Sequence, residues 1–134
     1  GDENLDSGEV VDSGVDLDSG VFVKNSPFEP NHEKSKLQSL LDHIGSRFGL
    51  KAIILTLGAK GAILWRSGTK LLSVKAAPVD VVDTVGAGDA FLAGVLYGWV
   101  NNWNDTEALA LGSKMGAYVA GHRSATPELA IDFL

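Results

Sequence analysis

The sequence contains no cysteine, which excludes disulfide bonds, thiol nucleophiles and thiolate metal sites from its 134 residues. No apolar run approaches the ~20 residues that a transmembrane helix requires. The chain opens on an acidic segment rather than on the basic and apolar pattern of a signal peptide. These absences are typical of a cytoplasmic protein without a membrane partner, and that is the location we expect.

Positive charge is scarce and has no clustered pattern. The formal net charge is −6, and residues 1–23 hold seven carboxylates without a lysine or arginine. The rest of the chain is close to neutral and shows no basic stripe. Binding to nucleic acid is therefore not expected.

The acidic segment, residues 1–26, repeats the triplet Asp-Ser-Gly, which begins at Asp6, Asp12 and Asp18. Regularly spaced carboxylates suit calcium, although the spacing is not that of an EF-hand. The alternatives are polar turns, a flexible acidic tail, or short strands built on the intervening valines. We treat this segment as separate from residues 27–134, which carry the patterns of a folded domain.

Hydrophobic periodicity predicts alternating helices and strands in the folded domain. A helix is expected over about 32–48, with one apolar face and a stop at Gly49. The next elements expected are strands at 52–57, 62–65, 71–74 and 79–82, followed by helices at about 89–100 and 105–121. The run at 52–57 is continuously apolar, as expected for a buried strand of an α/β sheet. Asn104 and Glu107 are spaced to cap the last helix reciprocally. The order predicts an α/β fold in which the first and last strands share one sheet.

Both late helices carry small residues at four-residue spacing. They are Ala90, Gly94 and Gly98 in the first helix, and Ala108, Gly112, Gly116 and Ala120 in the second. Glycine inside a helix costs roughly 1 kcal/mol relative to alanine. The repeats therefore indicate that another backbone or a flat ligand approaches closely. Helix packing and a ligand boundary both explain the pattern, and each can hold at a different end.

A glycine-rich turn joins the expected strand at 79–82 to the following helix. Gly86, Ala87 and Gly88 form the turn, and Asp89 stands at the expected helix start. Backbone N–H groups at a helix N-terminus attract an anion such as a phosphate. A carboxylate there suits a base that takes a proton from a hydroxyl attacking a phosphoryl group, with the turn amides as an anion hole. The alternative is that Asp89 only caps the helix.

The longer stretch DTVGAGDAFLAG, residues 83–94, closely resembles the C-terminal signature of the ribokinase-like (PfkB-type) carbohydrate kinases. The upstream stretch TLGAKGA, residues 56–62, resembles the strand and turn that line the nucleotide in that family. With the last helix, the resemblance covers about residues 35–128. It implies the C-terminal half of a three-layer α/β/α sandwich.

The resemblance implies ATP-dependent phosphorylation of an alcohol group on a sugar or nucleoside, with Mg²⁺ and, in some members, K⁺. Carried over by position, Asp89 is the catalytic base and Gly86, Ala87 and Gly88 form the anion hole. The positions that correspond to nucleotide-binding and monovalent-cation residues are Thr56, Gly58, Gly61 and Ser113 for the nucleotide, and Asp83 and Val85 for the cation. Thr84 is either a structural hydroxyl or a phosphate contact.

Some of the family pattern is missing from this sequence. The N-terminal half of the family, which carries the substrate-binding residues, has no counterpart here, and no N-x-x-E motif for Mg²⁺ is found. The stretch at 31–34 has the wrong spacing, so no metal ligand is assigned. Ser113 stands where several members have an asparagine, and residues 122–125 lack a glycine that many members place before the alanine.

We therefore expect the ATP-binding, catalytic-base half of a carbohydrate kinase, and the full-length protein is a candidate homodimer. The 134 residues alone are not expected to phosphorylate a sugar at ordinary rates. The alternative is a nucleotide-binding or scaffold module that has the fold and lacks catalysis.

Overall fold

The computed structural model describes residues 31–128. The elements in chain order are α1 (Asn31–Phe48), β1 (Ala52–Thr56), the 3₁₀ turn η2 (Gly58–Lys60), β2 (Ala62–Arg66), β3 (Leu72–Val74), α2 (Ala87–Val100) and α3 (Asp105–Ala120). The acidic segment at 1–26 lies outside the described residues, and so do the calcium, tail and strand interpretations of it. Within residues 31–128, no helix combines the length and the apolar character needed to cross a bilayer.

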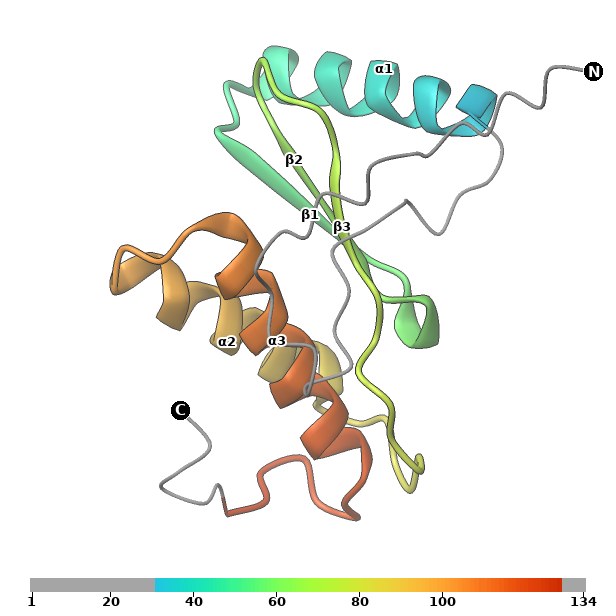
Figure 1. The fold of residues 1–134 in the computed structure, drawn as a ribbon, viewed down its shortest axis with the longest axis vertical. Coiled ribbons are helices and arrows are strands. Elements are labelled where there is room, and N and C mark those ends of the chain that lie inside the picture. The colour runs from blue at the N-terminus through green and yellow to red at the C-terminus, as the bar shows by residue number, and fades with distance from the viewer. Residues whose placement is uncertain (1–30, 129–134) are drawn as a thin grey trace, which may run out of the picture.

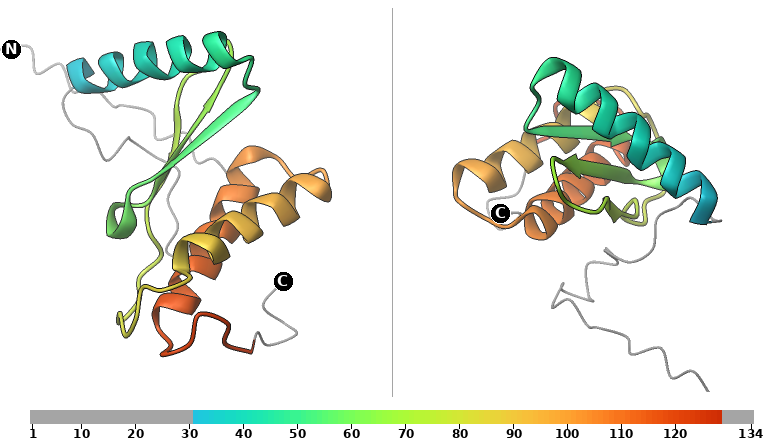
Figure 2. Two further views of the ribbon diagram at one scale, coloured as in Figure 1. Left: turned by 180° about the vertical axis from the view of Figure 1, so that it is seen from behind. Right: turned by 90° about the horizontal axis from the view of Figure 1, so that it is seen from above.

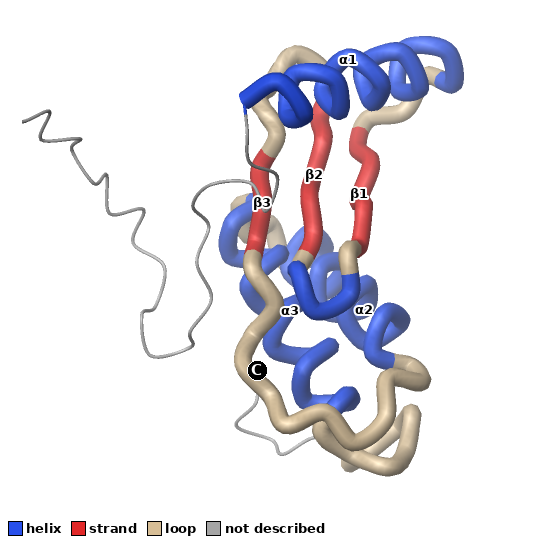
Figure 3. Tube along the Cα trace, turned by 90° about the vertical axis from the view of Figure 1, so that its right-hand side faces the viewer, coloured by secondary structure: helices blue, strands red, loops and turns tan. Residues whose placement is uncertain are grey.

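The three strands form one antiparallel sheet in the order β1-β2-β3 (Figure 3). The turn η2 joins β1 to β2, and its end is closed by a hydrogen bond of 2.8 Å from the Leu57 N–H to the Gly61 carbonyl. Gly61 has a φ of +103°, and a Cβ there would overlap the Val74 carbonyl of β3. Only glycine fits this position, because both the backbone angle and the neighbouring strand exclude a side chain.

Helices lie on both faces of the sheet (Figure 1). Because successive side chains of a strand point to opposite faces, the residues of β2 divide between the two layers of helices. Trp65 of β2 faces α1, where it packs directly on Gly45 and donates from Nε1 to Asp42 Oδ1 over 2.7 Å. Its neighbours Ala62 and Leu64 belong instead to the core shared with α2 and α3. The α/β fold with an α/β/α layering is thus confirmed.

The core between the sheet and the α2–α3 pair is closely packed. Val95 and Leu109 are fully buried there, and burying each such side chain stabilises the fold by roughly 1.5–3 kcal/mol. The two helices lie side by side (Figure 2). A Cβ built on Gly94 would lie 2.8 Å from Gly112 Cα, and one on Gly98 would lie 2.8 Å from Ala108 Cβ. At these positions the small residues serve helix–helix packing.

Several local predictions are confirmed. Gly49 ends α1 with a φ of +61°. Asn104 and Glu107 form a reciprocal capping box at the start of α3, in which each side chain satisfies a backbone N–H that the helix leaves free.

Three local predictions are wrong. Residues 79–82 form a loop, not a strand, since Pro78 cannot donate to a sheet and the Val82 N–H donates to Ala120 of α3 instead. The side chains of β1 are mostly half-buried rather than buried, because β1 has a strand on one side only. Helix α2 begins at Ala87, two residues earlier than expected.

Candidate functional site

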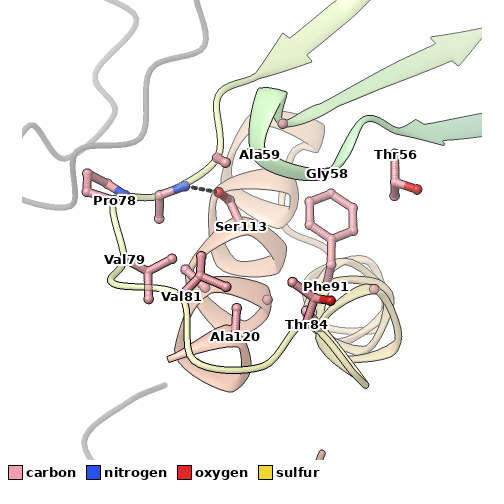
Figure 4. Close-up of a pocket in the computed structure, with 17 residues that line it drawn as sticks. Thr56, Gly58, Ala59, Pro78, Val79, Val81, Thr84, Phe91, Ser113 and Ala120 are labelled. Atoms are coloured by element: carbon pink, nitrogen blue, oxygen red, sulfur yellow. Dashed lines mark hydrogen bonds between the residues drawn. The ribbon is translucent and has the colours of Figure 1, made fainter. Parts of the chain in front are cut away.

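A cavity of about 470 Å³ lies between η2, the loop after β3 and the facing parts of α2 and α3 (Figure 4). Its volume falls in the range of roughly 300–1,000 Å³ that is common for small-molecule sites. The lining residues are Thr56, Gly58, Ala59, Gly61, Ala76, Ala77, Pro78, Val79, Val81, Thr84, Ala87, Gly88, Phe91, Ser113, Gly116, Ala117 and Ala120. Most of these are small or apolar, so the cavity suits a flat ligand with one polar end.

The cavity brings together six of the residues predicted from the sequence. They are Thr56, Gly58, Gly61, Ala87, Gly88 and Ser113. Asp89 is the neighbour of Gly88 in the first turn of α2 and is exposed, but it is not part of the lining. Gly86, Asp83 and Val85 also lie outside the lining, although Thr84 between them belongs to it.

The N-terminus of α2 is open toward the cavity. Its N-cap is Gly86, in the left-handed conformation with a φ of +82°, and no side chain caps the helix. The Ala87 N–H donates to the Thr84 carbonyl over 3.2 Å, while the next amides of the first turn have no partner within the helix. A Cβ built on Gly88 would meet no atom within 4 Å. The interpretation of Asp89 as the helix cap is therefore wrong.

Ser113 faces the cavity from α3, but its hydroxyl is already engaged on both sides. It accepts from the Ala77 N–H over 2.9 Å and donates to the Lys75 carbonyl over 3.0 Å. The side chain is 5% exposed, and Figure 4 shows the bond to the loop. In this arrangement Ser113 holds the loop after β3 against α3. A nucleotide contact by Ser113 remains a prediction.

The segment that leads into α2 is fixed by its own hydrogen bonds. Asp83 Oδ1 accepts from the Val85 N–H over 3.0 Å, and the Asp83 N–H donates to the Ala120 carbonyl over 3.1 Å. A Cβ on Gly86 would lie 2.8 Å from the Cβ of Ala125. The loop is thereby packed against the segment that follows α3. Monovalent-cation binding at Asp83 and Val85 remains a prediction.

The small-residue stripe has different surroundings along its length. Gly116 and Ala120 line the cavity, whereas Ala108 and Gly112 face α2 and do not. A ligand boundary is therefore restricted to the C-terminal half of α3. The four-residue spacing is the same along the whole helix, so the sequence pattern alone does not show where helix packing ends and the cavity lining begins.

Sequence reasoning missed the apolar wall that residues 76–81 contribute to the cavity. Residues 79–81 were assigned to an expected strand and residues 76–78 to the gap before it, although Pro78 favours a loop. The sequence signal that could have identified this part of the cavity lining is Pro78 with small apolar residues on both sides.

The open end of α2 fits a phosphate group better than a metal ion. Free amides, a glycine without steric neighbours and the helix dipole all favour an anion. Among residues 31–128, no three histidine, aspartate or glutamate side chains gather as a metal site. Mg²⁺ usually binds through one or two carboxylates together with substrate phosphates and water, so the phosphate is the group that these residues can hold by themselves.

Comparison with known proteins identifies the same family that the sequence motifs resemble. Residues 28–131 match the family described as pfkB family carbohydrate kinase. Fructoselysine 6-kinase of Escherichia coli is 41% identical over 69 residues, which cover 52% of this chain and 26% of that protein. The 1-phosphofructokinase of Haemophilus influenzae is 35% identical over 102 residues, covering 67% and 32%. The solved structure of adenosine kinase from Sinorhizobium meliloti has a TM-score of 0.63 at 27% identity, covering 73% and 29%.

The chain therefore belongs to the pfkB family of carbohydrate kinases. It spans about a quarter to a third of the length of these relatives.

Proposed function

We propose that this chain is the nucleotide-binding and catalytic-base part of an ATP-dependent phosphotransferase, whose acceptor is an alcohol group of a sugar or nucleoside. The observation that carries the proposal is the uncapped start of α2, where Gly88 borders the cavity and Asp89 follows in the same turn. A carboxylate beside an anion-binding helix end has no use in anion binding alone. It has a use if it takes a proton from the attacking hydroxyl.

Each part of the site has a role in this proposal. The free amides of the first turn of α2 hold a phosphate and stabilise the charge that develops during transfer. The apolar walls, which include Phe91, Val79 and Val81, take the nucleobase. Mg²⁺, when bound with the nucleotide, neutralises phosphate charge. Asp83 and Val85 are the candidates for a K⁺ site, and homodimerisation belongs to the complete protein.

The named relatives support the acceptor class, because they include two sugar kinases and an adenosine kinase. Since this chain spans a third or less of their length, we expect the acceptor contacts to come from residues outside it. Holding both reactants in attack geometry supplies roughly 7–11 kcal/mol of a barrier. The 134 residues alone are therefore expected to bind nucleotide without ordinary kinase turnover.

The test is Asp89→Asn in the complete enzyme. If Asp89 is the base, kcat falls by about 10²–10⁴ because proton removal from the acceptor is lost. Nucleotide affinity stays near normal or improves slightly, since a negative charge beside the phosphates is removed. Steady-state kinetics with saturating nucleotide and calorimetric titration of the nucleotide measure the two quantities separately.

Asp80→Asn is the matched control, because Asp80 is an exposed aspartate of the preceding loop and does not line the cavity. It removes the same charge and should leave kcat unchanged. Retained kcat in the Asp89 variant would contradict the catalytic role. A complete wild-type protein that binds nucleotide but phosphorylates no acceptor would instead favour the scaffold alternative.

A further inference from the structure

The cavity between α3 and the loop after β3 offers few groups that distinguish one nucleobase from another. Within residues 31–128, three of its lining side chains have a polar atom, the hydroxyl groups of Thr56, Thr84 and Ser113, and none is an amide, a carboxylate or a cation. A hydroxyl group rotates and can both donate and accept a hydrogen bond. It therefore pairs equally well with a base edge that donates and with one that accepts.

Adenine and guanine differ in their hydrogen-bonding groups at position 6 of the ring. Adenine has an amino group there, which donates, and guanine has a carbonyl oxygen, which accepts. A site with a fixed donor or acceptor opposite this position rejects the wrong base strongly, because the mismatch leaves buried polar groups unpaired. A site without such a group has only size and shape with which to discriminate.

Several backbone groups beside the cavity are already engaged within the protein. The Ser113 hydroxyl accepts from the Ala77 N–H over 2.9 Å and donates to the Lys75 carbonyl over 3.0 Å. Pro78 has no N–H to donate. On α3, the Ala120 carbonyl accepts two backbone N–H groups of the segment before α2, at 2.8 and 3.1 Å. These groups hold the loop against α3 and are not free to recognise a base.

The surface that the cavity offers to a base is mainly apolar. Val79 and Val81 of the loop are 38% and 60% exposed. Figure 4 shows their side chains on one side of the cavity and Phe91 of α2 on the other. Contact with such side chains depends on the flat faces of the base, which adenine, guanine and hypoxanthine share.

We propose that this cavity does not distinguish between purine bases, so that GTP and ITP serve as phosphoryl donors about as well as ATP. The phosphates, which the first-turn amides of α2 hold, are the same in all three nucleotides. With each donor, the bond from the γ-phosphorus to the β–γ bridging oxygen breaks and a bond to the acceptor oxygen forms. The acceptor proton goes to Asp89, and ADP, GDP or IDP leaves. The inference rests on the proposed function, since it requires a nucleotide in this cavity.

Competition between the Mg²⁺ complexes of the three nucleotides, measured on the complete enzyme, tests the inference. GTP and ITP should displace ATP with dissociation constants within about tenfold of that of ATP, and kcat/KM for the three donors should agree within the same range. Tight ATP binding with a larger preference for ATP would overturn the inference and leave the proposed function intact. If none of the three nucleotides binds, the proposed function fails and the inference fails with it.

Two matched valine variants test whether the base lies on the apolar side of the cavity. Val81→Ala removes apolar contact and should weaken ATP and GTP by the same factor, about fourfold to tenfold. Val82→Ala is the control, because Val82 is 53% exposed in the same loop and does not line the cavity. It should leave both affinities unchanged. A loss for one nucleotide only, or equal effects of the two variants, would overturn the inference.

Discussion

The two ends of the α2–α3 pair use the same small residues for different purposes. At one end, Gly94 and Gly112 bring the helix backbones together, and a Cβ on Gly94 would lie 2.8 Å from Gly112 Cα. At the other end, Gly88 and Gly116 border the cavity, and a Cβ on Gly88 would meet nothing within 4 Å. We call these the closed end and the open end. Contact requires glycine at the closed end, and Gly116 is also close to α2, since a Cβ there would lie 3.0 Å from the Ala87 carbonyl oxygen. Gly88 differs from all three because it has free space beside it.

The closed end is also fixed by a polar cluster that joins three elements. Arg66 of β2 forms a bidentate ion pair with Asp105 of α3, at 2.7 and 2.8 Å. Asp105 also accepts from Trp99 Nε1 of α2 over 2.9 Å, and the Arg66 guanidinium lies 4.8 Å from the Trp99 ring centroid. The open end has no comparable cluster among the described residues, which leaves the first turn of α2 accessible to a ligand.

The largest effect is expected from a methyl group at the closed end. In Gly112→Ala, the new Cβ would lie 2.7 Å from both the Phe91 carbonyl oxygen and Val95 Cγ2. Backbone cannot move aside as a flexible side chain does, so the helices must separate. We expect the free energy of unfolding to fall by about 1–3 kcal/mol, measured by urea denaturation.

Gly88→Ala is the matched change at the open end. The Cβ has free space and the backbone is already helical, so the free energy of unfolding should stay the same or rise by about 0.5–1 kcal/mol. In the complete enzyme, nucleotide affinity should fall by about tenfold, because the methyl group stands between the first-turn amides and a phosphate. Equal losses of stability in both variants, or unchanged nucleotide affinity in Gly88→Ala, would remove the distinction between the two ends.

Most of the fold was predictable from the sequence because its signals are local. The apolar face of α1, the turn at Gly49 and the capping box of Asn104 and Glu107 each depend on residues a few positions apart. The loop at 79–82 was not predictable from its valines, because β-branched residues favour a strand only where a neighbouring strand exists. Here α3, not a strand, accepts the Val82 N–H.

The candidate site was predictable where a motif carries it, and not elsewhere. The glycines of the turns at 58–61 and 86–88 were found from sequence, since their types and spacing reflect the close approach of a ligand or backbone. The engagement of Ser113 with Lys75 and Ala77 was not, because those partners lie 38 and 36 residues away. Contacts at such a distance in the chain follow from packing alone.

A smaller effect is expected at Ser113, which lies between the two ends. Ser113→Ala leaves the buried Ala77 N–H without an acceptor and the Lys75 carbonyl without a donor. The free energy of unfolding should fall by about 1–2 kcal/mol. Nucleotide affinity, titrated below the unfolding temperature, should change little because the hydroxyl is already occupied. A large loss of affinity with unchanged stability would instead make Ser113 a nucleotide contact and extend the open end along α3.

The smallest effect is expected from the ion pair at the closed end. Hydrogen bonding to Arg66 lowers the pKa of Asp105 below its ordinary value of 3.8, and the Trp99 bond acts in the same direction. A carboxyl group with a lowered pKa in the folded state adds stability above 3.8, and this stability is lost as the pH falls through the folded value. Asp105→Asn should therefore lower the free energy of unfolding at pH 7 by about 0.2–1 kcal/mol, since both side chains are partly exposed. Below pH 3.8 the difference between variant and wild type should shrink. A difference that persists unchanged at low pH would mean that Asp105 stabilises the closed end through its packing and not through its charge.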